Sequence, residues 1–341
     1  MSRLRWAISV LAWAAIGARS QHVHAAPREW LVSSLAPLGS PTGDAIAAFG
    51  RLTEEASARA VKVKLRLGGI LGDETDTVRL CGQGQIQVTA VSLGAVIAVV
   101  PELRALELPY LFRDVEAYQK WAAAIRDGAD PTLQRLFERR GLILLGVASL
   151  GWRNIASVRK PIHSPRDLHQ LRVRAQPSDL HPIIWQALGA QPKSFGLNEL
   201  NSALDVDLVE AFDLPAFMLF ATSMTERVRF LTLSQHVASI GVIMANADAW
   251  KSLSPQARAK IRAGMPGLLA RLKRQNFELE AALVGLLAER KVQVITPTAA
   301  EMAEFKAATR SVEAYVRRTG SKQELELLDL AQRIVREGAG K

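Results

Sequence analysis

The sequence contains one cysteine, Cys81, among its 341 residues. A single cysteine cannot form an intramolecular disulfide, so the stability of the chain must come from an ordinary hydrophobic core. Val78 precedes Cys81 by three positions, a spacing that places both side chains on one face of a helix. We therefore expect Cys81 to be a small buried residue.

The usual catalytic and metal-binding signatures are also missing. The sequence has no G-x-S-x-G elbow, H-E-x-x-H helix or Walker loop. Gly82-Gln83-Gly84 matches part of a dinucleotide fingerprint, but it precedes a predicted strand, whereas the fingerprint follows one. Four histidines after residue 25 show no zinc spacing and are expected on the surface or in loops. They are His163, His169, His181 and His236. We predict no enzyme, no cofactor and no metal site.

Long apolar runs are scarce, and the clearest one stands at the beginning of the chain. Two arginines precede the uncharged stretch from Trp6 to Ala18, and Val23-His24-Ala25 ends the segment with compact residues. This order is typical of a secretory signal peptide cut before Ala26. The run is shorter than the roughly 17–25 residues that span a bilayer, which disfavours the alternative of an uncleaved membrane anchor. We predict a Sec-type signal peptide over residues 1–25, no lipid anchor and a mature protein that lies outside the cytoplasm and is not embedded in the membrane.

Composition and charge limit the partners. The chain is 49% hydrophobic and 22% charged, as globular proteins are, and it is long enough for one large or two ordinary domains. Its formal net charge is +10, but the basic residues are dispersed without interleaved aromatic side chains. Dispersed charge and export argue against nucleic acid as a partner, and an anionic small ligand or an acidic membrane surface is more compatible with the positive net charge.

Predicted strands alternate with predicted helices. Strands are expected at 30–33, 61–67, 86–90, 142–147, 171–175, 208–212 and 292–295, and helices at 44–56, 73–81, 118–127, 132–140, 180–188 and 197–204. A long helical region should run from 254 to about 290, with a kink or interruption near Pro266. This alternation implies βαβ units, a mainly parallel sheet and two α/β domains that meet near residue 150. Because no linker separates them, we expect several chain crossings and a hinge.

The carboxyl ends of strands supply ligand contacts in an open α/β sheet. That rule points to 33–40, 89–92, 152–153, 174–178 and Asp213. Arg172 and Arg174 share one face of a predicted strand, and Arg174 lies nearer its carboxyl end. An arginine there can hold a carboxylate through paired N–H donors, although periodicity alone favours a solvated surface residue. For Trp152, core packing is the alternative to a ligand contact.

Seven groups of residues, in order along the chain, carry a family resemblance. They are Gly69–Glu74, Leu106–Arg113, Lys160–Ile162 with Asp167-Leu168, Leu171–Arg174, Leu188–Ala190, Glu199–Leu204, and Asp248–Trp250 with Leu253–Pro255. Together they resemble the substrate-binding proteins of tripartite ATP-independent periplasmic (TRAP) transporters, the DctP-like family. The resemblance covers nearly all of the chain after the predicted signal peptide.

This resemblance implies a periplasmic-binding-protein-like α/β fold with two lobes and a ligand cleft and hinge between them. Lobe I would comprise 26–150 and 239–278, and lobe II would comprise 151–238 and 279–341. The carboxylate-binding arginine of the family falls on Arg174, and an assisting arginine falls on Arg153. The implied partners are a small carboxylate ligand and the small and large integral membrane permease subunits.

The chain departs from the family pattern after its predicted strand at 208–212. Leu214 stands where many members have a ligand-contacting asparagine, and Asp213 replaces a glutamate. Without that amide, a plain C4-dicarboxylate is a poorer expectation. Phe212 and Phe217 would add to a less polar wall, so a more apolar carboxylate is expected. Asp213 could hold a cation or a ligand hydroxyl, or cap the next helix.

We therefore predict a periplasmic solute receptor that binds a small organic acid. The predicted ligand-binding residues are Arg174, Arg153, Asp213, Trp152, Ser92 and Phe217. A ligand-sensing protein that presents its closed form to a signalling receptor is the alternative, and a periplasmic enzyme acting on acids is a third interpretation.

Overall fold

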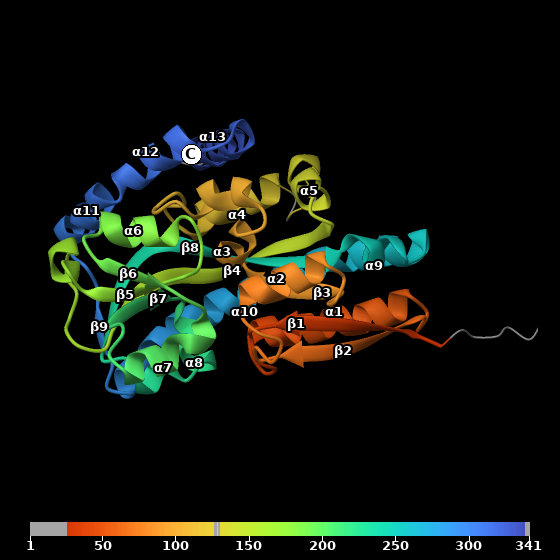
Figure 1. Ribbon diagram of the computed structural model, residues 1–341, viewed down its shortest axis with the longest axis horizontal. Coiled ribbons are helices and arrows are strands. Elements are labelled where there is room, and N and C mark those ends of the chain that lie inside the picture. Colours follow the sequence, from red (N-terminus) through yellow and green to blue (C-terminus); the bar gives the residue numbers. More distant parts are fainter. Residues whose placement is uncertain (1–25, 126–127, 129, 338–341) are drawn as a thin grey trace, which may run out of the picture.

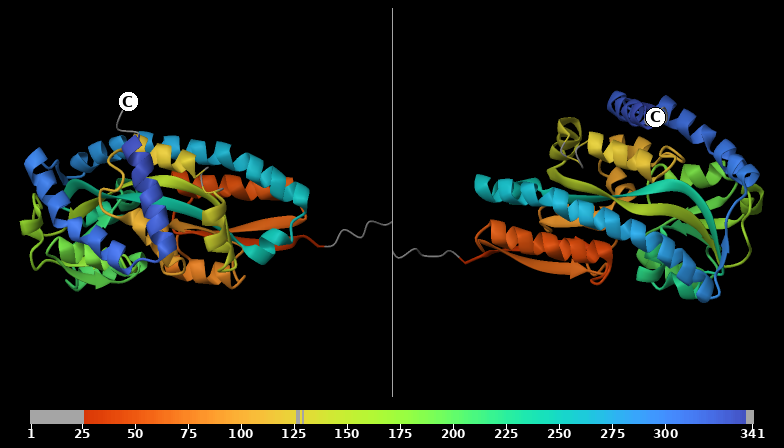
Figure 2. Two further views of the ribbon diagram at one scale, coloured as in Figure 1. Left: turned by 90° about the horizontal axis from the view of Figure 1, so that it is seen from above. Right: turned by 180° about the vertical axis from the view of Figure 1, so that it is seen from behind.

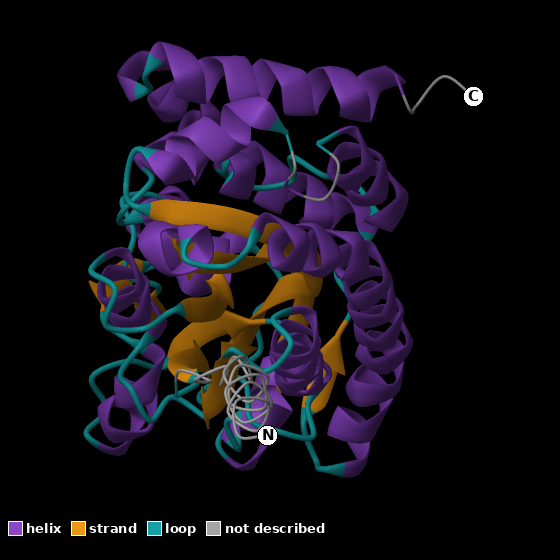
Figure 3. Cartoon of the chain, turned by 90° about the vertical axis from the view of Figure 1, so that its right-hand side faces the viewer, coloured by secondary structure: helices purple, strands orange, loops and turns teal. Residues whose placement is uncertain are grey.

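The computed structural model describes residues 26–125, 128 and 130–337. The predicted signal peptide, residues 1–25, lies outside the described residues. The described chain forms an elongated α/β molecule in which helices enclose a central sheet (Figure 1, Figure 3). None of the described helices combines the length and the apolar character needed to cross a membrane.

In the described part of the chain, nine strands form one mixed sheet. They are β1 (Arg28–Ser34), β2 (Val61–Leu67), β3 (Val88–Ser92), β4 (Leu142–Ser157), β5 (Arg172–Ala175), β6 (Gln191–Ser194), β7 (Ala211–Leu214), β8 (Phe230–Asn246) and β9 (Gln293–Ile295). The order is β2-β1-β3-β8-β4-β7-β5-β6, and β9 pairs with β8. The outer strands pair in parallel as predicted, at one end β1 with β2 and β3, at the other β5 with β6 and β7.

Two long strands, β4 and β8, join the two ends of the sheet. They pair antiparallel with each other, and β8 also pairs antiparallel with β3 while β4 does so with β7. Nearly every residue of β4 is buried, as expected for a strand covered on both faces. The chain therefore has one continuous sheet, and the predicted strand at 142–147 is only the first part of β4. The predicted lobe boundaries at 150 and 238 fall inside β4 and β8, so the division into lobes stays a proposal.

Helices cover both faces of the sheet. The α-helices are α1 (Pro41–Ala56), α2 (Glu74–Gly82), α3 (Leu93–Ile97), α4 (Val115–Ala124), α5 (Pro131–Glu138), α6 (His181–Ala187), α7 (Leu200–Asp205), α8 (Ala216–Ala221), α9 (Ala247–Lys251), α10 (Pro255–Glu289), α11 (Ala299–Ala308), α12 (Arg310–Thr319) and α13 (Lys322–Glu337). Short 3-10 helices are η1 (Pro101–Glu107), η3 (Pro165–Leu168), η4 (Leu197–Glu199) and η5 (Met224–Glu226). Polar caps fix the starts of several helices: the Ser40 side chain accepts from Gly43 at α1, and Asp73 forms a capping box with Asp76 at α2.

The longest helix, α10, runs along the length of the molecule behind the sheet (Figure 2). It packs against α1, β4 and α8. The predicted interruption near Pro266 is wrong, because α10 is continuous from Pro255 to Glu289. Pro266 is exposed, so the proline ring meets solvent instead of the sheet.

Separate hydrophobic clusters lie on the two faces of the sheet. One packs α4, α5 and α13 against β4 and β8, and it contains Val78 and Cys81, both fully buried as predicted. Burial raises the pKa of the Cys81 thiol to about 12, so the thiol stays protonated at neutral pH. A second cluster packs α1 and α10 on the opposite face. A Cβ on Gly146 of β4 would lie 2.7 Å from Leu269 Cδ1, so glycine allows α10 its close approach.

Candidate functional site

A cavity lies where the carboxyl ends of β3, β5 and β7 come together. Its empty volume is about 470 Å³, which includes space open to solvent. Both halves of the chain line it: Asp73, Glu74, Thr75, Ser92, Ala95 and Leu150 from the first, and Arg153, Arg174, Gln176, Pro177, Leu197, Leu214, Pro215, Met218 and Ser239 from the second. The position follows the strand-end rule in each half of the sheet: β5 and β7 are parallel to each other, and their carboxyl ends meet the carboxyl end of β3, which runs in the opposite direction.

Arg174, near the end of β5, is buried and lines this cavity. Its Nε donates to the carbonyl oxygen of Phe195 at 3.0 Å. Among the described residues, no carboxylate lies within ion-pair distance, and the two Nη atoms have no hydrogen-bond partner. Burial, together with the charge of Arg153, lowers the pKa of Arg174 to about 10. Arg174 is thus a buried cation at neutral pH with four free N–H donors.

Arg153 is also buried, but its charge is matched. Its Nε lies 2.5 Å and one Nη lies 3.0 Å from the two carboxylate oxygens of Asp213, which is fully buried. Burial alone would raise the pKa of Asp213, but Arg153 and His236 hold it well below its usual value. Burial likewise opposes the charge of Arg153, and Asp213 outweighs that effect and raises its pKa. The two side chains form a neutral ion pair, whereas Arg174 has no ion-pair partner among the described residues.

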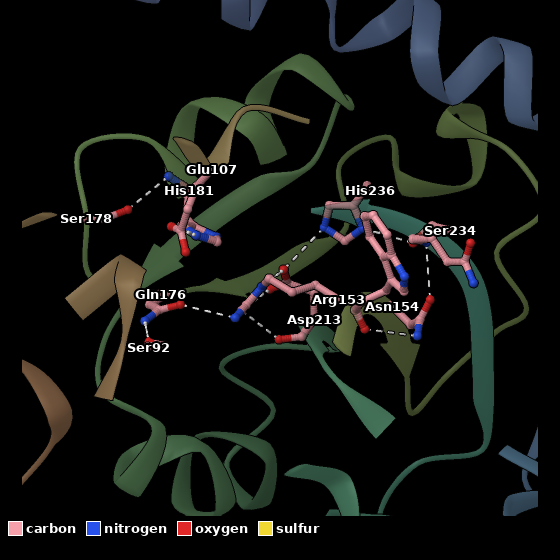
Figure 4. A network of polar contacts seen from close by, with 12 residues as sticks. Ser92, Glu107, Arg153, Asn154, Gln176, Ser178, His181, Asp213, Ser234 and His236 are labelled. Carbon is pink, nitrogen blue, oxygen red and sulfur yellow. Dashed lines mark hydrogen bonds and ion pairs between the residues drawn. The ribbon is translucent and has the colours of Figure 1, made fainter. Parts of the chain in front are cut away.

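A chain of hydrogen bonds connects this ion pair to the first half of the molecule (Figure 4). An Nη of Arg153 donates to Gln176 Oε1 at 3.1 Å, and Gln176 Nε2 donates to Ser92 Oγ at 2.7 Å. The Ser92 hydroxyl and backbone N–H both donate to Glu74, at 2.5 and 2.9 Å. Burial raises the pKa of Glu74, and the two hydrogen bonds from Ser92 oppose that shift. The network therefore spans the cavity from β7 to the start of α2.

Two histidines lie beside this network, which corrects the expectation that all four are on the surface or in loops. His236 and His181 are each 1% exposed. His236 Nε2 lies 3.2 Å from Asp213 Oδ2, and Nδ1 lies 2.9 Å from Ser234 Oγ. Burial lowers the pKa of His236, so the neutral ring donates from Nε2 to the ionised Asp213 and accepts at Nδ1 from Ser234. His181 Nε2 contacts Glu107 Oε2 at 2.9 Å across the two halves of the chain.

The predicted site residues divide into three groups. Arg174, Arg153 and Ser92 line the cavity together. Asp213 lies behind Arg153, with its carboxylate oxygens bonded to Arg153 and His236, and Phe217 lines a neighbouring cavity. Trp152 is partly buried against the core cluster beneath α4 and does not line the cavity.

Gln176 and Glu74 are among the polar residues of the cavity that the predicted site did not include. Gln176 lies within the segment 174–178 to which the strand-end rule pointed, and Glu74 begins α2 after the capping residue Asp73. In the described part of the chain, no group of three or more histidine, cysteine, aspartate or glutamate side chains is placed to hold a metal ion.

Known proteins resemble this chain over most of its length. The profile described as bacterial extracellular solute-binding protein, family 7, matches residues 32–319. A solute-binding protein of Verminephrobacter eiseniae is 28% identical over 298 residues, or 86% of each chain.

Solved structures give the same result. A TRAP periplasmic solute-binding protein from Bradyrhizobium in complex with galacturonate has a TM-score of 0.82 and 27% identity, covering 91% of this chain and all of that one. The sugar-acid-binding protein DctPAm from Advenella mimigardefordensis, in complex with galactonate, has a TM-score of 0.81 and 25% identity, covering 90% of this chain and 99% of that one. This likeness confirms the predicted periplasmic-binding-protein-like fold.

Proposed function

The chain belongs to family 7 of the bacterial extracellular solute-binding proteins, and we propose that it is the periplasmic receptor of a TRAP transporter that holds an organic acid at Arg174. This family consists of transport proteins and is not a class of enzymes. Two similar proteins bind galacturonate and galactonate, which are both sugar acids. Small acid sugars and related carboxylates are therefore the first ligands to test.

One observation carries the proposal: the guanidinium of Arg174 lies in a cavity with its terminal donors free. A buried cation without a counter-ion is costly, and a ligand carboxylate would supply both the negative charge and two parallel acceptors. Arg153 cannot fill this role to the same extent, because Asp213 and Gln176 already take most of its donors. Arg153 instead adds positive potential near Arg174 and orients Gln176.

Contacts across the cavity explain how binding would favour a closed form. Gln176 donates to Ser92, and the backbone N–H of Leu197 donates to Asp73 Oδ2 at 3.0 Å, so each bond joins the proposed lobes. A Cβ on Gly94 would lie 2.7 Å from the Gln176 amide carbon, so glycine permits this approach. An acid bound at Arg174 would contact both sides at once and so stabilise closure, because it binds the closed form better than the open one.

The remaining parts of the proposal concern location and partners. The family is periplasmic, and the amino-terminal pattern of residues 1–25 suits export by a Sec-type signal peptide. The closed, loaded receptor would deliver its acid to the small and large permease subunits in the membrane. No contact among the described residues favours a signalling role.

The test compares two arginines of one strand. Arg174→Ala should weaken the binding of galacturonate, galactonate or succinate by at least about 100-fold, because it removes a charge-assisted bidentate contact. Arg172→Ala is the control, since Arg172 pairs at the surface with Glu210 at 3.3 Å. Titration calorimetry should show unchanged affinity for this control. Equal affinities of wild type and Arg174→Ala would contradict the proposal.

A further inference from the structure

A second cavity adjoins the first and differs from it in chemistry. Its empty volume is about 450 Å³, including space open to solvent, and it lies between β1, α1, β4 and α10. Apolar side chains make up most of its lining, among them Ile46, Phe217 and Leu272. Of the four charged residues that line the first cavity, Glu74 also lines the second, whereas Arg174, Arg153 and Asp73 do not.

Three residues stand between the two cavities and line both. They are Glu74, Leu150 and Met218. Met218 is unbranched and flexible, so its side chain can shift to let a ligand reach from one cavity into the other. An acid held at Arg174 therefore has an apolar space within reach of its far end.

The second cavity also contains an unsatisfied hydroxyl. Thr42, near the start of α1, is 9% exposed, and its Oγ1 has no hydrogen-bond partner. The other polar side chains of the lining are engaged, since Ser34 Oγ accepts from the backbone of Ala36 and Glu74 accepts from Ser92. A buried hydroxyl without a partner is unfavourable, and an oxygen atom of a ligand would satisfy it.

We propose that this second cavity receives the tail of the ligand, and that the preferred substrates are monocarboxylic acids with an apolar chain bearing one oxygen near its far end. The inference rests on the proposed function, because Arg174 holds the carboxylate. The polar groups of the first cavity would then surround the carboxylate end, and Thr42 would meet the oxygen of the tail. A short dicarboxylate or a hexuronate would leave the apolar space unused.

Chain-length comparison tests the proposal with butanoate, hexanoate, 6-hydroxyhexanoate and galacturonate as probes. Each added methylene should tighten binding to the wild type about fourfold, as burial of apolar surface does. The terminal hydroxyl of 6-hydroxyhexanoate should tighten it further through Thr42.

Two variants separate the apolar and polar contributions of the second cavity to ligand affinity. Thr42→Val keeps the shape and removes the hydroxyl, so it should weaken 6-hydroxyhexanoate binding by about three- to tenfold and leave hexanoate binding unchanged. Ala36→Leu, in the loop between β1 and α1, should fill part of the cavity and weaken hexanoate by about tenfold or more while galacturonate binding stays the same. Thr42→Val gives a result even if Ala36→Leu fails to fold.

The outcomes distinguish this inference from the function on which it rests. In one outcome, the protein binds galacturonate through Arg174, but its affinity does not rise from butanoate to hexanoate. This result would overturn the tail subsite and leave the receptor function intact. Unchanged 6-hydroxyhexanoate affinity in Thr42→Val would overturn the role of the hydroxyl. Failure of the wild type to bind any acid would overturn the proposed function and the subsite together.

Discussion

Arg153 and Arg174 show how two buried arginines that line the same cavity can differ in role. Asp213 neutralises Arg153, whereas the only hydrogen bond of Arg174 within the described chain goes to a backbone carbonyl. A buried arginine paired with a carboxylate stabilises the fold and contributes a fixed electrostatic potential near the cavity. An unmatched cation that faces a cavity instead provides a site for an anion.

Removing the carboxylate partner of Arg153 tests whether this buried ion pair stabilises the fold. Asp213→Asn leaves a buried guanidinium without its counter-ion and replaces the charged acceptor of His236 with a neutral amide, so it should lower the free energy of unfolding by about 3–5 kcal/mol. Urea denaturation followed by circular dichroism measures the change. Asp207→Asn is the matched control, because Asp207 is 62% exposed in its pair with Arg159 and should cost no more than about 1 kcal/mol. Equal losses in the two variants would contradict the structural role of the buried pair.

At the scale of elements, α10 carries an acidic side chain against the sheet. Glu280 accepts a hydrogen bond from the backbone of Ala216, and a Cβ on Gly151 would lie 2.7 Å from its Oε2. Burial raises the pKa of Glu280 from 4.5 to about 7. The folded state thus favours the neutral carboxyl group more than the unfolded chain does. Its contribution to stability is complete below about pH 4.5 and is lost as the pH rises through about 7.

The variant Glu280→Gln removes this titration. Relative to wild type, the variant should gain about 2–3 kcal/mol of stability between pH 5 and pH 8, because only the wild type must bury a charge at the higher pH. Unfolding curves at the two pH values measure the gain. Glu289→Gln, at an exposed position of the same helix, should show no such difference. A pH-independent effect of Glu280→Gln would rule out the buried carboxyl group as its cause.

Local patterns in the sequence predicted most elements but not how the sheet is joined. The alternating residues of β2 and the capped start of α2 depend on neighbours in sequence, so periodicity was sufficient there. The antiparallel pairing of β4 with β8 depends on contacts about 90 residues apart along the chain, and β8 was missed. His236 lies on that missed strand, which explains why its burial could not be predicted.

The candidate site was predicted in part for a related reason. The strand-end rule and the family resemblance together located Arg174, whose strand position follows from local pattern. The pairing of Arg153 with Asp213, and the link from Gln176 to Ser92, require the folded arrangement of four strands. Sequence alone cannot distinguish an arginine that is already paired from one that is free.

For the whole molecule, the shared sheet has a consequence for unfolding. β4 and β8 run through both proposed lobes, and α10 packs on elements of each. The lobes should therefore unfold together, in one calorimetric transition whose van't Hoff and calorimetric enthalpies agree. A bound acid at about 100 times its dissociation constant should stabilise the folded protein by about 2.7 kcal/mol and shift that single transition upward. Two separate transitions in scanning calorimetry would show that the lobes are independent units.

The central claim is that Arg174 holds the carboxylate of the ligand. A crystal structure of the protein with an acid that raises its melting temperature tests this most directly. We predict two carboxylate oxygens at about 2.7–2.9 Å from the Nη atoms of Arg174, with the pair of Arg153 and Asp213 intact. A carboxylate bound elsewhere, with the Nη atoms of Arg174 still free, would contradict the account.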